Sequence, residues 1–357
     1  MTDKFPRCYD VEEAGERLMW ITSSRASIAP KLTLGTFLEV SVDGTELWGP
    51  ALTVQQDTAI ASRVAVRPAQ NGRVRVAVDL LNDAELILEV SGVVVDADLP
   101  PVTKRQHENR ARFLRQGLNL AGFHQKPFDA AIKAIERIRL FFDRSVGGGV
   151  QAADHITTNV GPGISGSSRY FSHKNDVDSK DVVPFDTEVD PKGYLAALAS
   201  STFLHTKDNV VSYVQYETDP LTGTGTYKAC SPAAIKAGDI VTCKLAFMLV
   251  PMPKKSNVGW KMLNVLKAVC VMDNTVTEEA NTTAVLEDLQ IEPEHVEASL
   301  KRGSVSFEGT LAAPPKRSRR MSIDEGNESA DPSQAFTTHS ALPGDFVANL
   351  DFVADFS

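Results

Sequence analysis

The chain has 357 residues, of which 42% are hydrophobic and 23% charged, and this composition excludes a chain that is disordered throughout. Its formal net charge is −9 at pH 7. No repeat of about 20–50 residues is found, which excludes a solenoid, and no apolar run reaches the roughly 18–20 residues of a membrane-spanning helix. We therefore expect no membrane partner.

The N-terminal third of the sequence predicts a helix followed by strands. A helix-capping pattern begins at Asp10, so we expect residues 1–30 to form an N-terminal helical segment. Residues 31–101 are expected to form a small antiparallel β module. Within them, Asn71-Gly72 is a strong hairpin signal, and apolar and polar side chains alternate strictly after it.

Residues 102–149 are expected to form a helical connector with a basic face. The clearest helix runs from Pro127 to Arg144 and is followed by three glycines, which commonly end helices. At about 100° per residue, its apolar side chains fall on one face. These side chains are Phe128, Ala131, Ile132, Ile135, Ile138 and Phe142.

The C-terminal half predicts strands and then a tail. Long apolar runs over residues 150–275 indicate a larger β-rich domain, and residues 276–357 are expected to be mostly disordered. The expected fold class is therefore α+β: two β-rich blocks, each a barrel or sandwich, joined by a helical connector and followed by a disordered acidic C-terminal tail.

Charge is distributed unevenly along the chain. Residues 321–357 hold seven acids and no Lys or Arg, so they account for −7 of the net −9 and leave −2 for residues 1–320. Residues 104–144 instead carry ten Lys or Arg against four Asp or Glu. This excess predicts a contact with nucleic-acid phosphates, although it also fits a solvated helix face or an acidic tail that folds back onto it. The candidate nucleic-acid-binding residues are Arg110, Arg112, Arg115, Lys126, Lys133, Arg137 and Arg144.

An alternative hypothesis is a metal-dependent enzyme. His173 and His205 flank an acidic stretch, and together with the carboxylates of residues 176–190 they are ligand types that hold divalent cations. The spacing matches neither an EF-hand nor a facial triad, and a solvated acidic loop explains the same residues. We therefore assign no metal ligand and no catalytic residue.

No cofactor motif is found. Gly161–Gly166 has the letters of a dinucleotide-binding loop, but no βαβ unit follows it, so we predict no cofactor. Four scattered cysteines fit a reduced intracellular protein better than a disulfide framework. They are Cys8, Cys230, Cys243 and Cys270.

A short basic cluster lies between the β-rich region and the acidic end. Its side chains, Lys316, Arg317, Arg319 and Arg320, follow two prolines and are typical of a nuclear-import signal. The predicted location is therefore the nucleus, with the cytoplasm as the alternative. Ser322 follows the cluster and is a predicted phosphorylation site.

The last residues of the tail interleave acids with large apolar side chains. Charge keeps such a segment solvated while its apolar groups stay available to the groove of a protein partner, although the segment equally fits one that docks on its own domain. The candidate partner-binding residues are Phe346, Leu350, Phe352, Val353 and Phe356.

Several motifs in the middle of the chain resemble a known group of sequences. The stretches Asn159–Ser168, Tyr170–Asp178 and His205–Val211 are similar to those of an uncharacterised protein family of mushroom-forming basidiomycete fungi, over roughly residues 104–273. That family has no known activity, so the resemblance implies no site residue. The leading hypothesis is a non-enzymatic intracellular, nuclear adaptor that contacts nucleic acid and recruits a protein through its tail.

Overall fold

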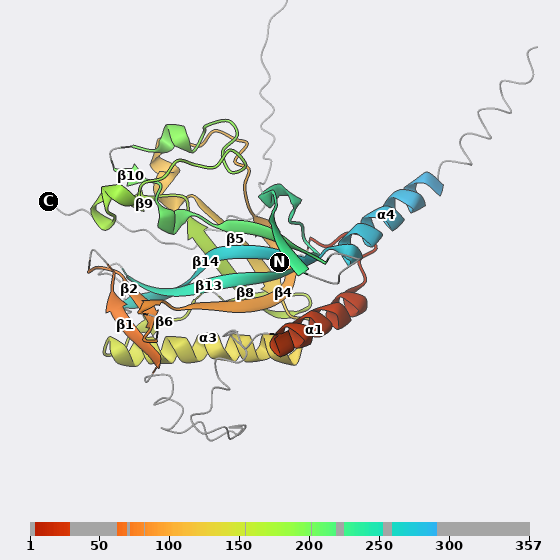
Figure 1. The fold of residues 1–357 in the computed structure, drawn as a ribbon, viewed down its shortest axis with the longest axis horizontal. Coiled ribbons are helices and arrows are strands. Elements are labelled where there is room, and N and C mark those ends of the chain that lie inside the picture. Colours follow the sequence, from red (N-terminus) through yellow and green to blue (C-terminus); the bar gives the residue numbers. More distant parts are fainter. Residues whose placement is uncertain are drawn as a thin grey trace, which may run out of the picture. The chain divides into compact units, whose positions relative to one another are not determined.

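The computed structural model describes residues 4–28, 63–69, 72–81, 83–153, 155–200, 202–218, 225–252 and 259–290 (Figure 1). The predicted nuclear-import cluster, the predicted phosphorylation site Ser322 and the predicted partner-binding segment near the C-terminus lie outside these residues. The chain separates into two units, Met1–Glu287 and Asp288–Ser357, and the first holds all the described strands.

Five strands close into a ring at the centre of the first unit. They are β4 (Ile87–Asp98), β5 (Arg115–Ala121), β8 (Gly161–Arg169), β13 (Ile240–Pro251) and β14 (Trp260–Asp273). The pairing order is β4-β5-β8-β14-β13 and back to β4. The pairing of β8 with β14 is parallel, and the others are antiparallel. This is the order and direction of strands in the OB fold, a partly open five-stranded Greek-key barrel.

Strand β4 holds the barrel together by pairing with two neighbours in turn. Its first half, Ile87–Val93, pairs with β13, and its second half, Val93–Asp98, pairs with β5. The nearly continuous apolar run of this strand buries side chains on both of its faces. Because its two halves pair with different strands, β4 links β13 to β5 within the barrel.

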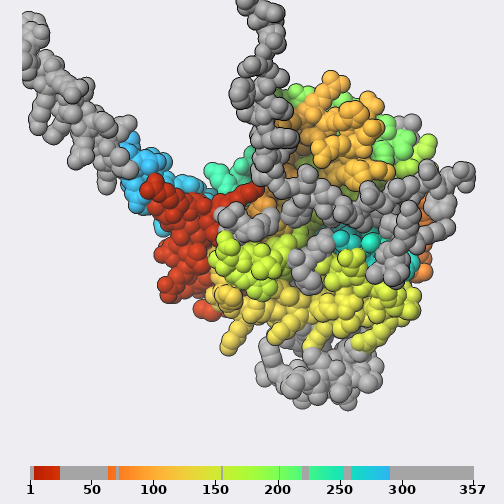
Figure 2. Space-filling model, turned by 180° about the vertical axis from the view of Figure 1, so that it is seen from behind, coloured from red at the N-terminus to blue at the C-terminus, as the bar shows by residue number. Residues whose placement is uncertain are grey.

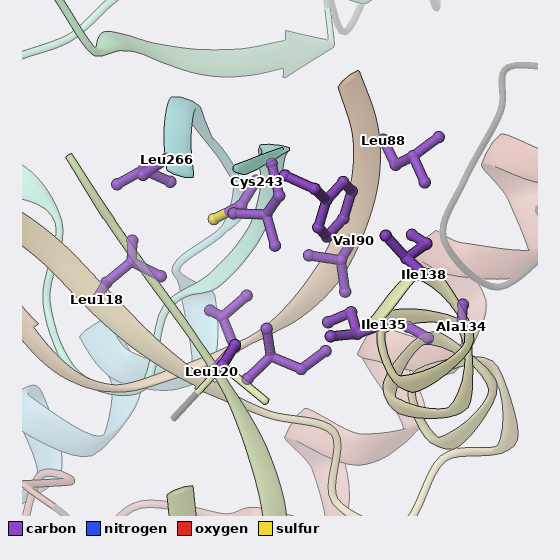
Figure 3. Close-up of a cluster of buried hydrophobic side chains, with 14 of the residues drawn as sticks. Leu88, Val90, Leu118, Leu120, Ala134, Ile135, Ile138, Cys243 and Leu266 are labelled. Carbon is purple, nitrogen blue, oxygen red and sulfur yellow. The ribbon is translucent and has the colours of Figure 1, made fainter. Parts of the chain in front are cut away.

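The helix α3 (Lys126–Ser145) packs against the barrel core with the predicted apolar face. Phe128, Ala131, Ile135, Ile138 and Phe142 are buried as expected. Figure 3 shows side chains of α3 pointing toward those of the barrel strands. The sequence prediction of this helix is confirmed, because its apolar period extends over about four turns, from Phe128 to Phe142.

Glycine allows the first turn of α3 to approach the barrel closely. A Cβ on Gly122 would lie 2.1 Å from Cγ of Phe128, so this position has no room for a side chain while the ring is in place. Phe128 is only 3% exposed. The short link between β5 and α3 thus fixes where the helix begins.

The remaining strands extend the sheet on both sides of the barrel. They are β1 (Val64–Pro68), β2 (Arg75–Asp79), β3 (Ala84–Glu85), β6 (Val150–Gln151), β7 (His155–Thr158), β11 (Ser212–Thr218) and β12 (Gly225–Ala229). A separate pair is formed by β9 (Ser172–His173) and β10 (Phe203–Leu204). The antiparallel pairing of β1 with β2 around Gly72 confirms the predicted hairpin.

The α+β fold class is confirmed, but the strands of the two expected β blocks pair with each other. Both β2 and β4 pair with β13, so all three belong to one sheet. The expected helical connector also differs. Residues 115–121 form strand β5 rather than a helix, because Leu118 and Leu120 fill the barrel interior at the period of a strand.

Two further helices flank the barrel. The predicted N-terminal helix is α1 (Val11–Ile28), and the Asp10 carboxylate caps it by accepting hydrogen bonds from the backbone N–H of Glu12 and Glu13, both at 2.9 Å. Its Leu18 packs with Val95 and Ala121, on the side of the sheet away from the barrel core.

The helix α4 (Thr275–Gln290) occupies residues that the sequence assigned to the tail. Its start is fixed by a capping contact, since the Asp273 carboxylate accepts a hydrogen bond from the backbone N–H of Thr275 at 2.8 Å. No helix within the described ranges is long and apolar enough to cross a membrane.

Candidate nucleic-acid interface

The outer surface of β5 and β8 carries a pair of arginines. In this antiparallel pair, Arg115 lies directly opposite Arg169, and Gly117 lies opposite Ser167. Side chains directly opposite each other share one face of a sheet. Leu118, Leu120 and Ile164 belong to the barrel core, so the arginines lie on the other, outer face.

Two like charges directly opposite each other destabilise a sheet by up to about 1 kcal/mol unless something offsets them. Arg115 donates a hydrogen bond to Oγ of Ser167 at 3.4 Å, and Arg169 has Asp176 as an electrostatic neighbour. Burial lowers the pKa of Arg169, while Asp176 acts in the opposite direction. A half-buried guanidinium of this kind has lost part of its hydration, which favours an anion beside it.

Small residues make the surface next to the arginine pair flat. Gly117, Ser165 and Ser167 are all partly exposed on this face. At Gly117 a Cβ would lie 2.7 Å from the backbone oxygen of Gly166, so the two strands approach too closely for a side chain there. The residues beside Arg115 on this face are therefore small.

The segment before β5 adds positive charge and an aromatic ring. Residues 99–115 contain five Lys or Arg and one acid. Within them, the 3₁₀ helix η2 (Glu108–Phe113) exposes Arg110 and Arg112, and Phe113 is 43% exposed. The guanidinium of Arg112 lies 4.4 Å from the centre of the Phe113 ring, a cation–π contact that orients the ring.

A small hydrophobic cluster anchors this segment. Ala111 of η2 is buried with Tyr170, Phe171, Leu195 and Leu198, which belong to the insertion between β8 and β13. Tyr170 also donates its backbone N–H to the carbonyl oxygen of Leu114 at 3.1 Å. The insertion therefore supports η2, and the exposed groups of η2 project from a packed base.

The seven predicted nucleic-acid-binding residues fall into two groups. Arg110, Arg112 and Arg115 belong to the interface just described. Lys126, Lys133, Arg137 and Arg144 lie on α3, of which Arg137 is half-buried and the other three are exposed. Figures 1 and 2 show η2 and α3 on different sides of this unit. The two groups therefore belong to different faces of the molecule.

Sequence reasoning missed Arg169 and Phe113. Arg169 follows a Gly- and Ser-rich stretch that gives no local signal, and only the pairing of β5 with β8 brings it beside Arg115. Phe113 did offer a signal, because it is an aromatic residue between two arginines, which is a common pattern in nucleic-acid-binding segments.

The structure gives both histidines of the metal hypothesis other roles. Nδ1 of buried His205 lies 2.8 Å from the backbone oxygen of Tyr170, and its ring stacks on Phe185 with centres 3.8 Å apart. Burial lowers the pKa of His205, which keeps it neutral at pH 7. His173 accepts a hydrogen bond at Nδ1 from the backbone N–H of Asn175 at 3.2 Å.

Three of the six carboxylates in residues 176–190 accept hydrogen bonds from backbone N–H groups that follow them in the chain. Asp178, Asp186 and Asp190 accept backbone N–H groups at 3.1, 2.7 and 2.8 Å. Within the part of the chain that the structure describes, no group of three or more His, Cys, Asp or Glu is placed to hold a metal ion. The proposed ligands are therefore not gathered into a metal site.

Comparisons with known proteins give a weak likeness to a solved structure. No protein-family model matches the chain, and no curated protein matches it. Among solved structures, the fold is similar to gp2.5, a single-stranded DNA-binding protein encoded by bacteriophage T7, with 10% sequence identity and a TM-score of 0.32. The match covers 53% of this chain and 87% of gp2.5.

Proposed function

We propose that the chain is a non-enzymatic binding protein that holds single-stranded nucleic acid across the outer face of β5 and β8. The observation that carries this proposal is the placement of Arg115 directly opposite Arg169, on the face of an OB-ordered barrel that faces away from the core. Two arginines on one face of a sheet supply positive charge that matches the fixed negative charge of a phosphate backbone.

The aromatic group favours a single strand over a duplex. Phe113 has one contact with Arg112 and remains 43% exposed, so a base can stack on it only where bases are unpaired. In a duplex the bases are stacked on each other and only their edges are accessible. Gly117 and Ser167 lie on the far side of the arginine pair from Phe113, so a strand whose base stacks on Phe113 would pass the arginine pair before it reaches these small residues.

The expected role of Phe113 gives a direct test. Fluorescence anisotropy of the full chain with a labelled 20-nucleotide oligo-dT should show binding, and Phe113→Ala should weaken it by about 1–3 kcal/mol, or roughly 5- to 150-fold. Phe113→Tyr keeps the stacking surface and should bind like the unchanged protein.

The matched control is Leu140→Ala, since Leu140 is an exposed apolar residue on α3. It should leave affinity unchanged. A hairpin duplex of the same length should bind more weakly than the single strand. Equal affinity for both, or no effect of Phe113→Ala, contradicts the proposed base contact.

We further propose that the chain acts in the nucleus and recruits a protein partner through its C-terminal segment. The basic cluster at 316–320 supports nuclear import, and the acidic, Phe-rich end supports recruitment of a partner. Ser322 lies beside the cluster, and we propose that its phosphorylation regulates import. In this role the barrel holds nucleic acid while the tail brings a second protein to it.

Two variants of the full chain separate these roles in cells. Replacing the four basic residues of the 316–320 cluster with Ala should abolish nuclear accumulation. Replacing Phe346, Phe352 and Phe356 with Ala should abolish co-purification of the partner and leave location unchanged. A nuclear signal in the first variant overturns the import proposal, and a retained partner in the second overturns the recruitment proposal.

A further inference from the structure

The face that carries the arginine pair also holds a carboxylate, that of Asp98 at the end of β4. Asp98 lies directly opposite Gly117 on β5, and Gly117 lies directly opposite Ser167 on β8. Residues directly opposite each other in antiparallel strands share one face of a sheet, so these three form one row across the barrel surface. The neighbouring Ala97 packs against the barrel core, which places Asp98 on the outer face.

Two carboxylates of β4 lie on this face, and they differ in their partners. Asp96, opposite Asn119, forms an ion pair with Lys4 at 2.7 Å. Asp98 is exposed, and among the residues that the structure describes its carboxylate forms no ion pair and no hydrogen bond. An ionised carboxylate repels a phosphate and can only accept hydrogen bonds, so it favours a neutral group with N–H donors beside it.

The row of Asp98 lies next to the row of the arginine pair. Arg115 is two residues before Gly117 on β5, and Arg169 is two residues after Ser167 on β8, so the two rows are about 7 Å apart along the strands. A strand whose phosphate is bound by the arginines would therefore place a neighbouring nucleotide over Gly117. Because Asp98 repels a second phosphate there, that nucleotide would present its base to the carboxylate.

We propose that Asp98 recognises guanine in the bound single strand, an inference that rests on the proposed function. The Watson–Crick edge of guanine presents two adjacent N–H donors, at N1 and N2, and a carboxylate accepts such a pair through its two oxygens. Adenine and cytosine place an acceptor beside their amino group, and thymine offers one N–H between two carbonyls. Gly117 contributes no side chain to this row, so only backbone lies beneath the base.

A comparison of oligonucleotides separates this recognition from binding itself. Fluorescence anisotropy of the full chain compares a 20-nucleotide oligo-dT with a strand of the same length in which every fourth thymine is replaced by guanine. The unchanged protein should bind the guanine-containing strand more tightly by roughly 5- to 150-fold, the range expected for one bidentate contact between a side chain and a base. Inosine in place of guanine lacks the N2 amino group and should reduce this preference.

Two variants test whether the preference comes from Asp98. Asp98→Asn keeps the shape of the side chain but replaces one acceptor with a donor. It should bind oligo-dT at least as tightly as the unchanged protein, because a negative charge is lost, and should bind the guanine-containing strand no better than oligo-dT. The matched control is Glu279→Gln, which removes the same charge from an exposed position on α4 and should keep the preference.

The outcomes distinguish the role of Asp98 from the proposed function. If the unchanged protein binds neither strand, the proposed function and the role of Asp98 are both overturned. Equal affinity for the two strands, or a guanine preference that survives Asp98→Asn, overturns the role of Asp98 alone. The inosine strand probes the same contact without any substitution, so an undiminished preference for it also overturns this role, even where Asp98→Asn loses its fold.

Discussion

Replacing Arg115 and Arg169 together with Ala should lower the affinity for a single-stranded oligonucleotide by about two orders of magnitude at low salt. Each hydrogen bond to a charged group contributes about 1.5–3 kcal/mol, and the pair supplies at least two. The slope of log K against log salt should also fall by about 1.4, since each phosphate contact on a single strand contributes about 0.7. Anisotropy titrations measure the affinity and the salt slope. They are made at about 50 to 300 mM salt, a range that includes the physiological value of about 150 mM.

The matched control is the double variant Lys126→Ala and Lys133→Ala, which removes the same formal charge from exposed positions on α3. It should reduce affinity by less than about threefold, through the long-range field alone. The reverse result, a large loss for the α3 variant and a small one for the arginine pair, would place the nucleic acid along α3 and end the assignment to β5 and β8.

The second large effect concerns the contact between Gly122 and Phe128. Phe128→Ala should destabilise the protein by about 3–5 kcal/mol, because it removes a buried ring at the start of α3. Gly122→Ala should cost about 1–3 kcal/mol, since its Cβ meets the ring at 2.1 Å. The double variant should cost less than the sum by about 1–3 kcal/mol, because the space left by the ring accommodates the new methyl group. Urea unfolding of all four proteins measures the cycle.

Gly193→Ala is a useful comparison for that cycle. An added Cβ there meets no atom within 4 Å, but the backbone has φ of +67°, so any loss of stability comes from the backbone alone. Its effect should add to that of Phe128→Ala without coupling. Strict additivity of Gly122→Ala with Phe128→Ala would show that the packing described at this contact is wrong.

The sequence predicted elements whose signal is local and continuous. The apolar face of α3 repeats over the whole helix, and the turn at Gly72 sits between two alternating runs, so both were identified correctly. Strand β5 was missed because a basic stretch precedes it and Gly117 and Asn119 interrupt its apolar residues. The pairing of β4 with β13 joins segments far apart in the sequence, and no local sequence pattern predicts such a pairing.

The candidate site was predicted in part for the same reason. Arg110, Arg112 and Arg115 stood out because they cluster in sequence, whereas Arg169 reaches them only through the pairing of β5 with β8. The acidic stretch at 176–190 gave the opposite error. Its density of Asp suggested metal ligands, yet residues such as Asp178 and Asp186 cap the backbone of short turns, a local role in which Asp is equally favoured.

Because β4 pairs with two strands, the protein should not tolerate truncation after this strand. A fragment that begins after residue 98 keeps both arginines, the aromatic ring and α3, but it loses the strand that joins β13 to β5. Such a fragment leaves the edges of β5 and β13 that pair with β4 without a partner strand, and it removes part of the core against which α3 packs. It should therefore aggregate instead of showing weaker binding. The first 98 residues, which hold neither the arginines nor the aromatic ring, are in this sense as necessary to the proposed binding face as Arg115 itself.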